Sequence, residues 1–168
     1  MNPYVEYDNV IPLLAPVDIA STVTTTPYVD LKLANGGGFL VNFGLITSAT
    51  TTDREIVTME AATDPAGTEA AIAFNYRLSS AVGANAWGTI TSATTTGVSM
   101  DPANDDGKSL WIEIDPRYVE EQFADARYVR LVLTDTPDMT ACLVAITAFL
   151  DAAYKQATMT VATASASV

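Results

Sequence analysis

Short apolar segments, each about as long as a β-strand and each bounded by turn-forming residues, recur along this sequence. Residues 128–133 (YVRLVL) are the clearest of them. The chain also holds 23 threonines, and β-branched side chains suit the pleated surface of a sheet. Its 168 residues are enough for one domain. These features predict a mostly β fold: an antiparallel β-sandwich or barrel, jelly-roll-like, with one short helix and an extended N-terminal arm.

Eight segments are predicted as strands: residues 28–33, 39–46, 55–62, 72–79, 87–91, 109–115, 128–133 and 139–154. The last segment also keeps a helical period through Leu143, Ile146 and Leu150, so a helix is the alternative there. The β-rich surroundings favour a strand. Between the segments lie clusters of Asp, Asn, Pro and Gly, which are typical of turns.

The first two predicted strands, 28–33 and 39–46, are separated by Asn35 and three glycines, 36–38. A glycine run of this kind is typical of a turn, and it has neither the spacing nor the following helix of a phosphate-binding loop. The two strands are therefore predicted to form a hairpin.

One short helix is predicted at residues 115–123 (DPRYVEEQF). Asp115 is a favourable N-cap, and Pro116 suits the first helical position because its missing N–H has no partner there in any case.

The two ends of the chain differ in composition from the 18–155 body. Residues 1–17 carry three prolines among apolar residues, which opposes a helix and predicts an extended arm that docks on a partner. Its candidate contact residues are Pro3, Tyr4, Pro12, Leu13, Leu14 and Pro16. Residues 156–168 are mostly Ala, Thr, Ser and Val, and they predict a flexible tail that is loose or paired with another subunit.

The heptapeptide ITSATTT occurs at residues 46–52 and again at 90–96, 44 residues later. One interpretation is local reuse of a Thr-rich exit from a strand into a loop, and the other is a duplication that gives two similar halves. A repeat architecture needs about three units, so the pair does not predict a solenoid.

The charge balance disfavours two classes of partner. With 20 acidic and 8 basic residues the formal net charge is −12, which repels the phosphates of nucleic acid and anionic lipid. The longest mainly apolar stretch, residues 141–150, is shorter than the roughly 20 residues of a membrane span. The N-terminus has no secretory pattern, so we expect synthesis in the cytoplasm without export.

The sequence lacks the residues that several kinds of catalytic and metal-binding site require. The sequence has no histidine, which removes Ser-His-Asp and Cys-His catalysis and imidazole metal ligands. Its one cysteine, Cys142, lies in an apolar run and is predicted to be a small buried hydrophobe. No cofactor is expected.

Residues 101–108 (DPANDDGK) are the strongest candidate for a cation site, because closely spaced carboxylates and a glycine turn can wrap calcium. Aligning Gly107 with the sixth position of an EF-hand loop puts Glu113 at the twelfth but Pro102 at the first, where an oxygen ligand is required. A solvated acidic turn is therefore favoured over bound calcium.

Two other groups of residues bear on function. Glycoside hydrolysis needs a pair of carboxyl groups, and the candidate pairs are Glu113 with Asp115 on one strand face and Glu120 with Glu121. Any acidic protein offers such pairs. Trp87, Trp111 and Tyr76 could stack on a sugar, although aromatic residues in strands are more often core or subunit contacts.

Arg127 and Arg130 are expected to pair with the abundant acids in surface salt bridges that contribute little to stability.

The proline-bearing arm, the YVDLK segment at residues 28–32, the EAATDPAGT turn at 60–68 and Trp87 after a Gly-Ala-Asn turn together resemble small structural proteins of tailed bacteriophages. Among these the sequence is most similar in organisation, over residues 10–155, to head decoration (capsid cement) proteins. This resemblance implies a β-sandwich or barrel on the capsid surface, often a homotrimer, that binds the major capsid protein through an arm and needs no catalytic residue. No single functional residue is matched.

Two hypotheses of different class follow. The first is a virion structural protein, a capsid decoration protein that binds the outside of the head and stabilises it, with a tail structural protein as its nearby variant. The second is a carbohydrate- or cell-surface-binding β module that uses Trp87 and Trp111. A glycosidase is a third and weaker hypothesis, because it would need two acids that converge in a cleft.

Overall fold

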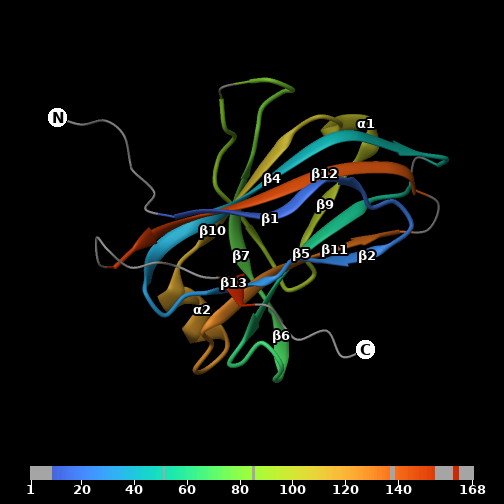
Figure 1. Cartoon of the computed structure of the whole chain (residues 1–168). Helices are drawn as coiled ribbons and strands as arrows, with labels where there is room; N and C mark the ends of the chain where they lie inside the picture. The colour runs from blue at the N-terminus through green and yellow to red at the C-terminus, as the bar shows by residue number, and fades with distance from the viewer. Residues whose placement is uncertain (1–8, 51, 85, 137–138, 154–160, 163–168) are drawn as a thin grey trace.

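The computed structural model describes residues 9–50, 52–84, 86–136, 139–153 and 161–162, and their strands form two antiparallel sheets packed face to face (Figure 1). The first sheet contains, in spatial order, β1 (Asn9–Asp18), β12 (Met139–Ala152), β4 (Ala34–Ser48), β10 (Ser109–Ile114), β7 (Phe74–Leu78) and β8 (Thr91–Ala93). The second contains β13 (Val161–Ala162), β3 (Tyr28–Asp30), β11 (Tyr128–Asp135), β5 (Glu55–Ala62) and β6 (Glu69–Ile72). Two short strands, β2 (Val23–Thr25) and β9 (Val98–Met100), pair with the remaining lengths of β11 and β5.

The strand order is that of a jelly roll. If β2 and β3 are counted as one interrupted strand, β1-β12-β4-β10 in the first sheet faces β2/β3-β11-β5-β6 in the second. In chain order these are strands 1-8-3-6 and 2-7-4-5, the arrangement of an eight-stranded jelly roll. β7 and β8 extend the first sheet beyond β10. The predicted fold class is confirmed.

The core lies between the sheets because the strands alternate buried and outward residues. Leu110, Ile112 and Ile114 of β10 are buried, while Trp111 and Glu113 between them point outward. The same alternation runs along β11 and β12, and the buried Cys142 belongs to it, as predicted. Each fully buried Leu, Ile, Val or Phe side chain contributes about 1.5–3 kcal/mol. The alternating burial along residues 139–152 is that of a strand, so the helix considered as the alternative for this segment is wrong.

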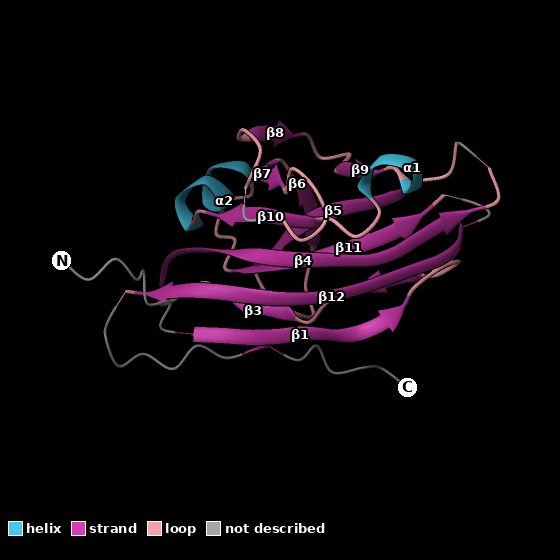
Figure 2. Cartoon of the chain, turned by 90° about the horizontal axis from the view of Figure 1, so that it is seen from above, coloured by secondary structure: helices cyan, strands magenta, loops and turns pink. Residues whose placement is uncertain are grey.

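β4 and β12 are the longest strands, with 15 and 14 residues, and they pair along almost their whole length. Figure 2 shows them side by side with β1, forming the long side of the sandwich. The two helices lie at opposite ends (Figures 1 and 2).

The structure contains a second helix that the sequence analysis did not predict. α2 (Pro116–Gln122) is the predicted helix, and the Asp115 side chain caps it by accepting a hydrogen bond from the Arg117 amide. α1 (Pro102–Asp105) begins in the same way, with Asp101 accepting from Ala103. The Asp-Pro pair that predicted α2 is thus present twice, and the acidic turn at 101–107 contains one helical turn.

The predicted hairpin of residues 28–33 and 39–46 is wrong. The chain turns at Leu31–Leu33, where Ala34 donates to the Leu31 carbonyl and the Asp30 carboxylate accepts from the Lys32 amide. It then crosses from β3 in the second sheet to β4 in the first. The three glycines lie inside β4, where a side chain on Gly37 would collide with the Phe149 carbonyl, 2.1 Å away. They permit close packing and do not make a turn.

The predicted strand at 72–79 is divided between the two sheets. β6 ends at Ile72, β7 begins at Phe74, and Ala73 between them has its backbone hydrogen bonds supplied by a side chain. The Gln122 amide oxygen accepts from the Ala73 N–H at 2.7 Å, and its nitrogen donates to the Ala73 carbonyl at 2.8 Å. The predicted strand at 87–91 is also wrong in extent: Trp87 forms an isolated bridge to Ser79, and β8 begins only at Thr91.

Residues 9–17 of the predicted arm belong to the sandwich. They form most of β1, an edge strand that is extended, as expected, but hydrogen-bonded to β12. Leu13 is buried in the core, so it is a core residue and not a partner contact, whereas Leu14 is partly buried against the core and Pro12 and Pro16 are exposed. Pro3 and Tyr4 lie outside the described residues, as does most of the predicted tail.

The two copies of the heptapeptide share one hydrogen bond. Thr50 and Thr52 hydrogen-bond through their hydroxyls, and so do their equivalents Thr94 and Thr96. The flanking strands differ, since β4 has 15 residues in the middle of its sheet and β8 has three at the edge. This favours local reuse of a strand exit over a duplicated half.

Candidate functional site

The outer face of the second sheet is closed by ion pairs. Arg130 bridges Glu60 at 2.8 Å and Glu69 at 2.6 Å and lies over the Tyr28 ring, 4.7 Å from its centroid. Arg127 makes a two-point contact with Asp30. The pairing predicted for both arginines is confirmed. Arg130 is mostly buried and shared by two carboxylates and a ring, so the expectation of an exposed surface pair was wrong for it.

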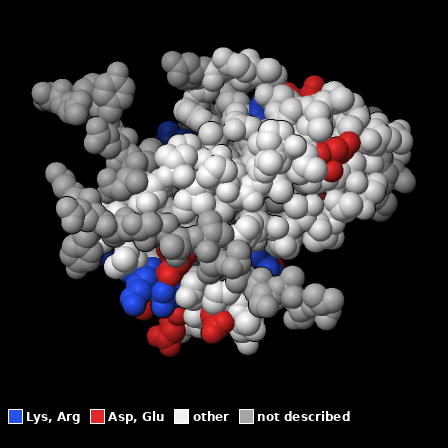
Figure 3. Space-filling view, in the orientation of Figure 1, with Lys and Arg blue, Asp and Glu red and all other residues white. Residues whose placement is uncertain are grey.

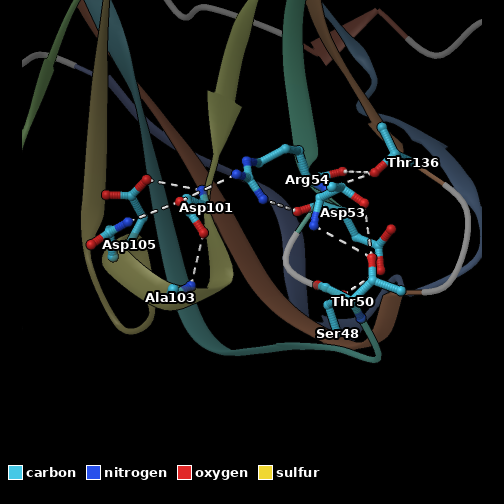
Figure 4. A network of polar contacts seen from close by, with 10 residues as sticks. Ser48, Thr50, Asp53, Arg54, Asp101, Ala103, Asp105 and Thr136 are labelled. Atoms are coloured by element: carbon cyan, nitrogen blue, oxygen red, sulfur yellow. Dashed lines mark hydrogen bonds and ion pairs between the residues drawn. The ribbon is translucent and has the colours of Figure 1, made fainter.

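One end of the sandwich is closed by a second polar network (Figure 4). Arg54, at the start of β5, donates to the Asp53 carbonyl and pairs with Asp101 at 3.4 Å, which joins the β4–β5 loop to the N-cap of α1. The hydroxyl of Ser48 donates to Asp53 and is the largest cause of that carboxylate's lowered pKa. Thr136 accepts from the Arg54 amide at 2.6 Å and adds the β11–β12 loop. These contacts fasten three loops together.

The carboxylates of the acidic segment at 101–108 also make hydrogen bonds and ion pairs within the protein. Asp101 caps α1, Asp105 pairs with Lys108 at 3.1 Å, and Asp106 accepts from the Ile46 amide at 2.8 Å. Among the described residues, no group of three or more His, Cys, Asp or Glu is placed to hold a metal ion. The segment therefore has a structural use that the sequence did not reveal: it anchors the end of β4.

The outer face of the first sheet is different, because it carries aromatic side chains around an open hollow of about 490 Å³. We call this hollow the aromatic groove. Its lining residues are Leu40, Arg77, Trp87, Trp111, Glu113 and Phe149. Three of them follow from register: Trp111 in β10 lies opposite Leu40 in β4 on one side and Arg77 in β7 on the other. Neighbouring strands thus bring together residues that are far apart in the sequence.

Trp111 lies across the sheet. A side chain on Gly38 would meet the indole ring, with Cζ2 at 2.3 Å and Cε2 at 2.5 Å, so the ring occupies the space above that glycine. Phe149 supports the ring from β12, with the two centroids 5.8 Å apart. Gly38 therefore makes room for a flat aromatic surface, and here the glycine run contributes directly to the groove.

Trp87 forms a second aromatic wall and is 43% exposed. It belongs to the connection between β7 and β8, which projects at the top of Figure 1. The bridge to Ser79 and the hydrogen bond from Gly88 to the Leu78 carbonyl, 2.8 Å, hold this residue beside β7.

Arg77 and Glu113 supply the polar groups of the groove. Within the described part of the chain neither side chain has a hydrogen-bond or ion-pair partner, in contrast to Arg127 and Arg130 on the opposite sheet. A guanidinium and a carboxylate that face the same hollow can donate to and accept from a bound molecule.

A second hollow of about 760 Å³ adjoins the first and shares Trp111 and Glu113 with it. It adds Asn35, Asp115, Arg117 and Asp151, so the aromatic groove continues along β10 towards α2. The recessed surface is long and open, the shape that suits an extended molecule.

Of the three aromatic residues considered for a sugar platform, the structure brings two together. Trp87 and Trp111 share one groove, but Tyr76 packs edge-on against Phe74 on the core side of β7. Sequence reasoning missed Arg77 and Phe149. Strand alternation could have found Arg77, which must face opposite to Tyr76, but the neighbours of Phe149 depend on a strand order that no local pattern contains.

A separate apolar patch lies at the other end of the same face. Leu143 of β12 and Leu45 of β4 are 42% and 49% exposed. Leu143 lies beside Gly44, and the register places Gly44 and Leu45 opposite it in the neighbouring strand. We call Leu45 and Leu143 the apolar patch. Figure 3 shows few charged atoms over the middle of β12 and β1, an acidic group over their right-hand end, and further charged atoms around α2.

No helix among the residues described is long and apolar enough to cross a membrane. Comparisons with protein-family models, with curated proteins and with solved structures find no match to this chain.

Proposed function

We propose that this protein is a virion structural protein: a decoration protein that binds the outside of a phage head, contacts the major capsid protein and stabilises the shell. The jelly-roll topology is the observation that supports this most, because that architecture recurs in viral capsid proteins. The fold alone is an analogy, since lectins and cupins share it.

The apolar patch supports docking on another protein. Isolated apolar side chains are ordinary on a protein surface, but neighbouring ones on adjacent strands favour an interaction site. The patch carries no charge in a chain whose net charge is −12, so it can approach another subunit with less electrostatic cost than the acidic surface around it. Its occupant in this proposal is the capsid lattice.

Shell stabilisation requires only binding. A protein that binds the assembled shell and not the free subunits stabilises the shell by mass action, and many repeated contacts add together.

The test measures assembly state and lattice binding together: mass by light scattering, then co-sedimentation with empty capsids of the same virus. We expect trimers that pellet only with capsids. The double variant Leu45→Lys with Leu143→Lys should lose co-sedimentation while it keeps its fold. Val82→Lys, at an exposed valine outside the apolar patch, is the matched control and should pellet normally. A monomer that ignores capsids would contradict the proposal.

A further inference from the structure

The aromatic groove is separate from the apolar patch that the proposed docking on a shell uses. It combines two kinds of surface: the flat Trp111 ring over Gly38 with the exposed Trp87 wall, and the polar groups of Arg77 and Glu113. A ligand that matches both must present apolar C–H faces and hydroxyl groups within one molecule. A sugar ring has this character.

We propose that the aromatic groove is a carbohydrate-binding site that takes a neutral oligosaccharide.

The position of the groove argues against a peptide strand as its occupant. It lies over β4, β10 and β7, whose backbone groups already pair with strands on both sides. A peptide that adds to a sheet needs the free N–H and C=O groups of an edge strand. Recognition here must therefore go through side chains: aromatic faces for stacking, and a guanidinium and a carboxylate for hydrogen bonds to hydroxyls.

The charges favour a neutral sugar over an anionic one. The continuation of the groove towards α2 carries Glu113, Asp115 and Asp151 against Arg117, and the whole chain has a net charge of −12. Sulfated or carboxylated glycans would be repelled by this field, whereas uncharged hydroxyls can donate to the carboxylates. The open, continuous shape suits several sugar units in a row.

The experiment uses an intrinsic reporter, because both tryptophans of the chain lie in the groove. Purified full-length protein is titrated with cellohexaose, maltohexaose and chitohexaose, and tryptophan fluorescence and isothermal titration calorimetry are recorded. We expect a saturable signal with at least one of these neutral hexasaccharides at up to millimolar concentration. Trp87→Ala and Arg77→Met should each weaken it about tenfold, a change of about 1.4 kcal/mol.

The matched control is Tyr118→Ala, which removes an exposed aromatic ring that does not line the groove. It should leave saccharide binding unchanged. Trp87 and Arg77 are preferred to Trp111 as test positions because their side chains are not packed over a glycine of the sheet.

Three results would overturn the proposal: no saturable binding of any of the three hexasaccharides, binding that survives both groove variants, or loss of capsid co-sedimentation in Trp87→Ala without any saccharide binding. The last result would assign the groove to the shell. The saccharide titration uses the isolated protein and the co-sedimentation uses capsids, so this proposal and the virion proposal can fail independently.

Discussion

Glu55 is a carboxyl group buried between the sheets, paired in register with Met100 of β9 and Asp135 of β11. Neither of its oxygens has a hydrogen-bond partner in the described part of the chain. Burial, with a further contribution from the charge of Asp135, raises its pKa from 4.5 to about 8. The folded protein therefore keeps a proton on Glu55 at neutral pH.

This proton makes stability depend on pH. The unfolded chain releases this proton near pH 4.5 and the folded protein near pH 8. The contribution of Glu55 to the free energy of unfolding is therefore complete below pH 4.5 and is lost as the pH rises through 8. The slope is at most about 1.4 kcal/mol per pH unit. Asp135 is the nearby acid that opposes ionisation, and the thiol of Cys142 and the carboxylate of Asp18 lie in the same region.

Glu55→Gln should remove this dependence, because the amide has nearly the same shape and does not titrate. Urea unfolding from pH 5 to pH 9 should show a variant that is no more stable than the wild type at the acidic end and more stable, by up to a few kcal/mol, at the alkaline end. Glu113→Gln, at a carboxylate in the open groove, is the control and should follow the wild type. A stability difference between Glu55→Gln and the wild type that stays constant with pH would count against the buried, protonated acid.

Cys142 should be unreactive in the folded protein. Burial, and then Glu55 once it is ionised at alkaline pH, raise the pKa of its thiol, so the reactive thiolate is scarce. Labelling with a thiol reagent should be slow in buffer and rise in step with unfolding as urea is added. Fast labelling under native conditions would show that this part of the core opens.

At the scale of elements, one side chain of α2 supplies the hydrogen bonds where the chain passes from one sheet to the other. Gln122 pairs with both backbone groups of Ala73, which no strand partner provides for between β6 and β7. Gln122→Ala should lower the free energy of unfolding by about 1–2 kcal/mol. Glu121→Ala, at the exposed neighbouring position, should change it by less than about 0.5 kcal/mol. Equal effects of the two variants in urea unfolding would contradict the bridging role.

The elements also show where local patterns are sufficient. Alternation predicted the strands at 55–62, 109–115 and 128–133 because each packs one face on a core. The glycine run at 36–38 was misread as a turn because its cause, contact with Phe149 and Trp111, comes from distant strands. The turn at Leu31–Leu33 had a weaker signal, the Asp30 side chain that accepts from the Lys32 amide. The Asp-Pro signal of α1 was present but was interpreted as a cation-binding or solvated turn.

At the scale of the whole molecule, composition and strand spacing predicted the sandwich, since a chain of this size with many short strands must bury one face of each. They could not predict the sites. The aromatic groove depends on the register of β4, β10 and β7, and the apolar patch on that of β12 and β4. These pairings are long-range, so only the folded strand order brings such residues together.

The contrast between the two outer faces is the main result at this scale. Arginine and carboxylate networks close the second sheet, whereas the first presents the aromatic groove and the apolar patch. Binding to a shell and binding to a sugar would therefore use two ends of one face.

The most direct measurement of the central claim is the melting temperature of empty heads, recorded by scanning calorimetry with and without saturating protein. If the protein is a decoration protein, the shell transition should shift upward with protein concentration until the sites are filled, because the ligand binds the assembled shell alone. The Leu45→Lys, Leu143→Lys variant should leave the transition in place, and Val82→Lys should shift it as the wild type does. A shell transition that does not move at saturating wild-type protein would contradict the stabilising role.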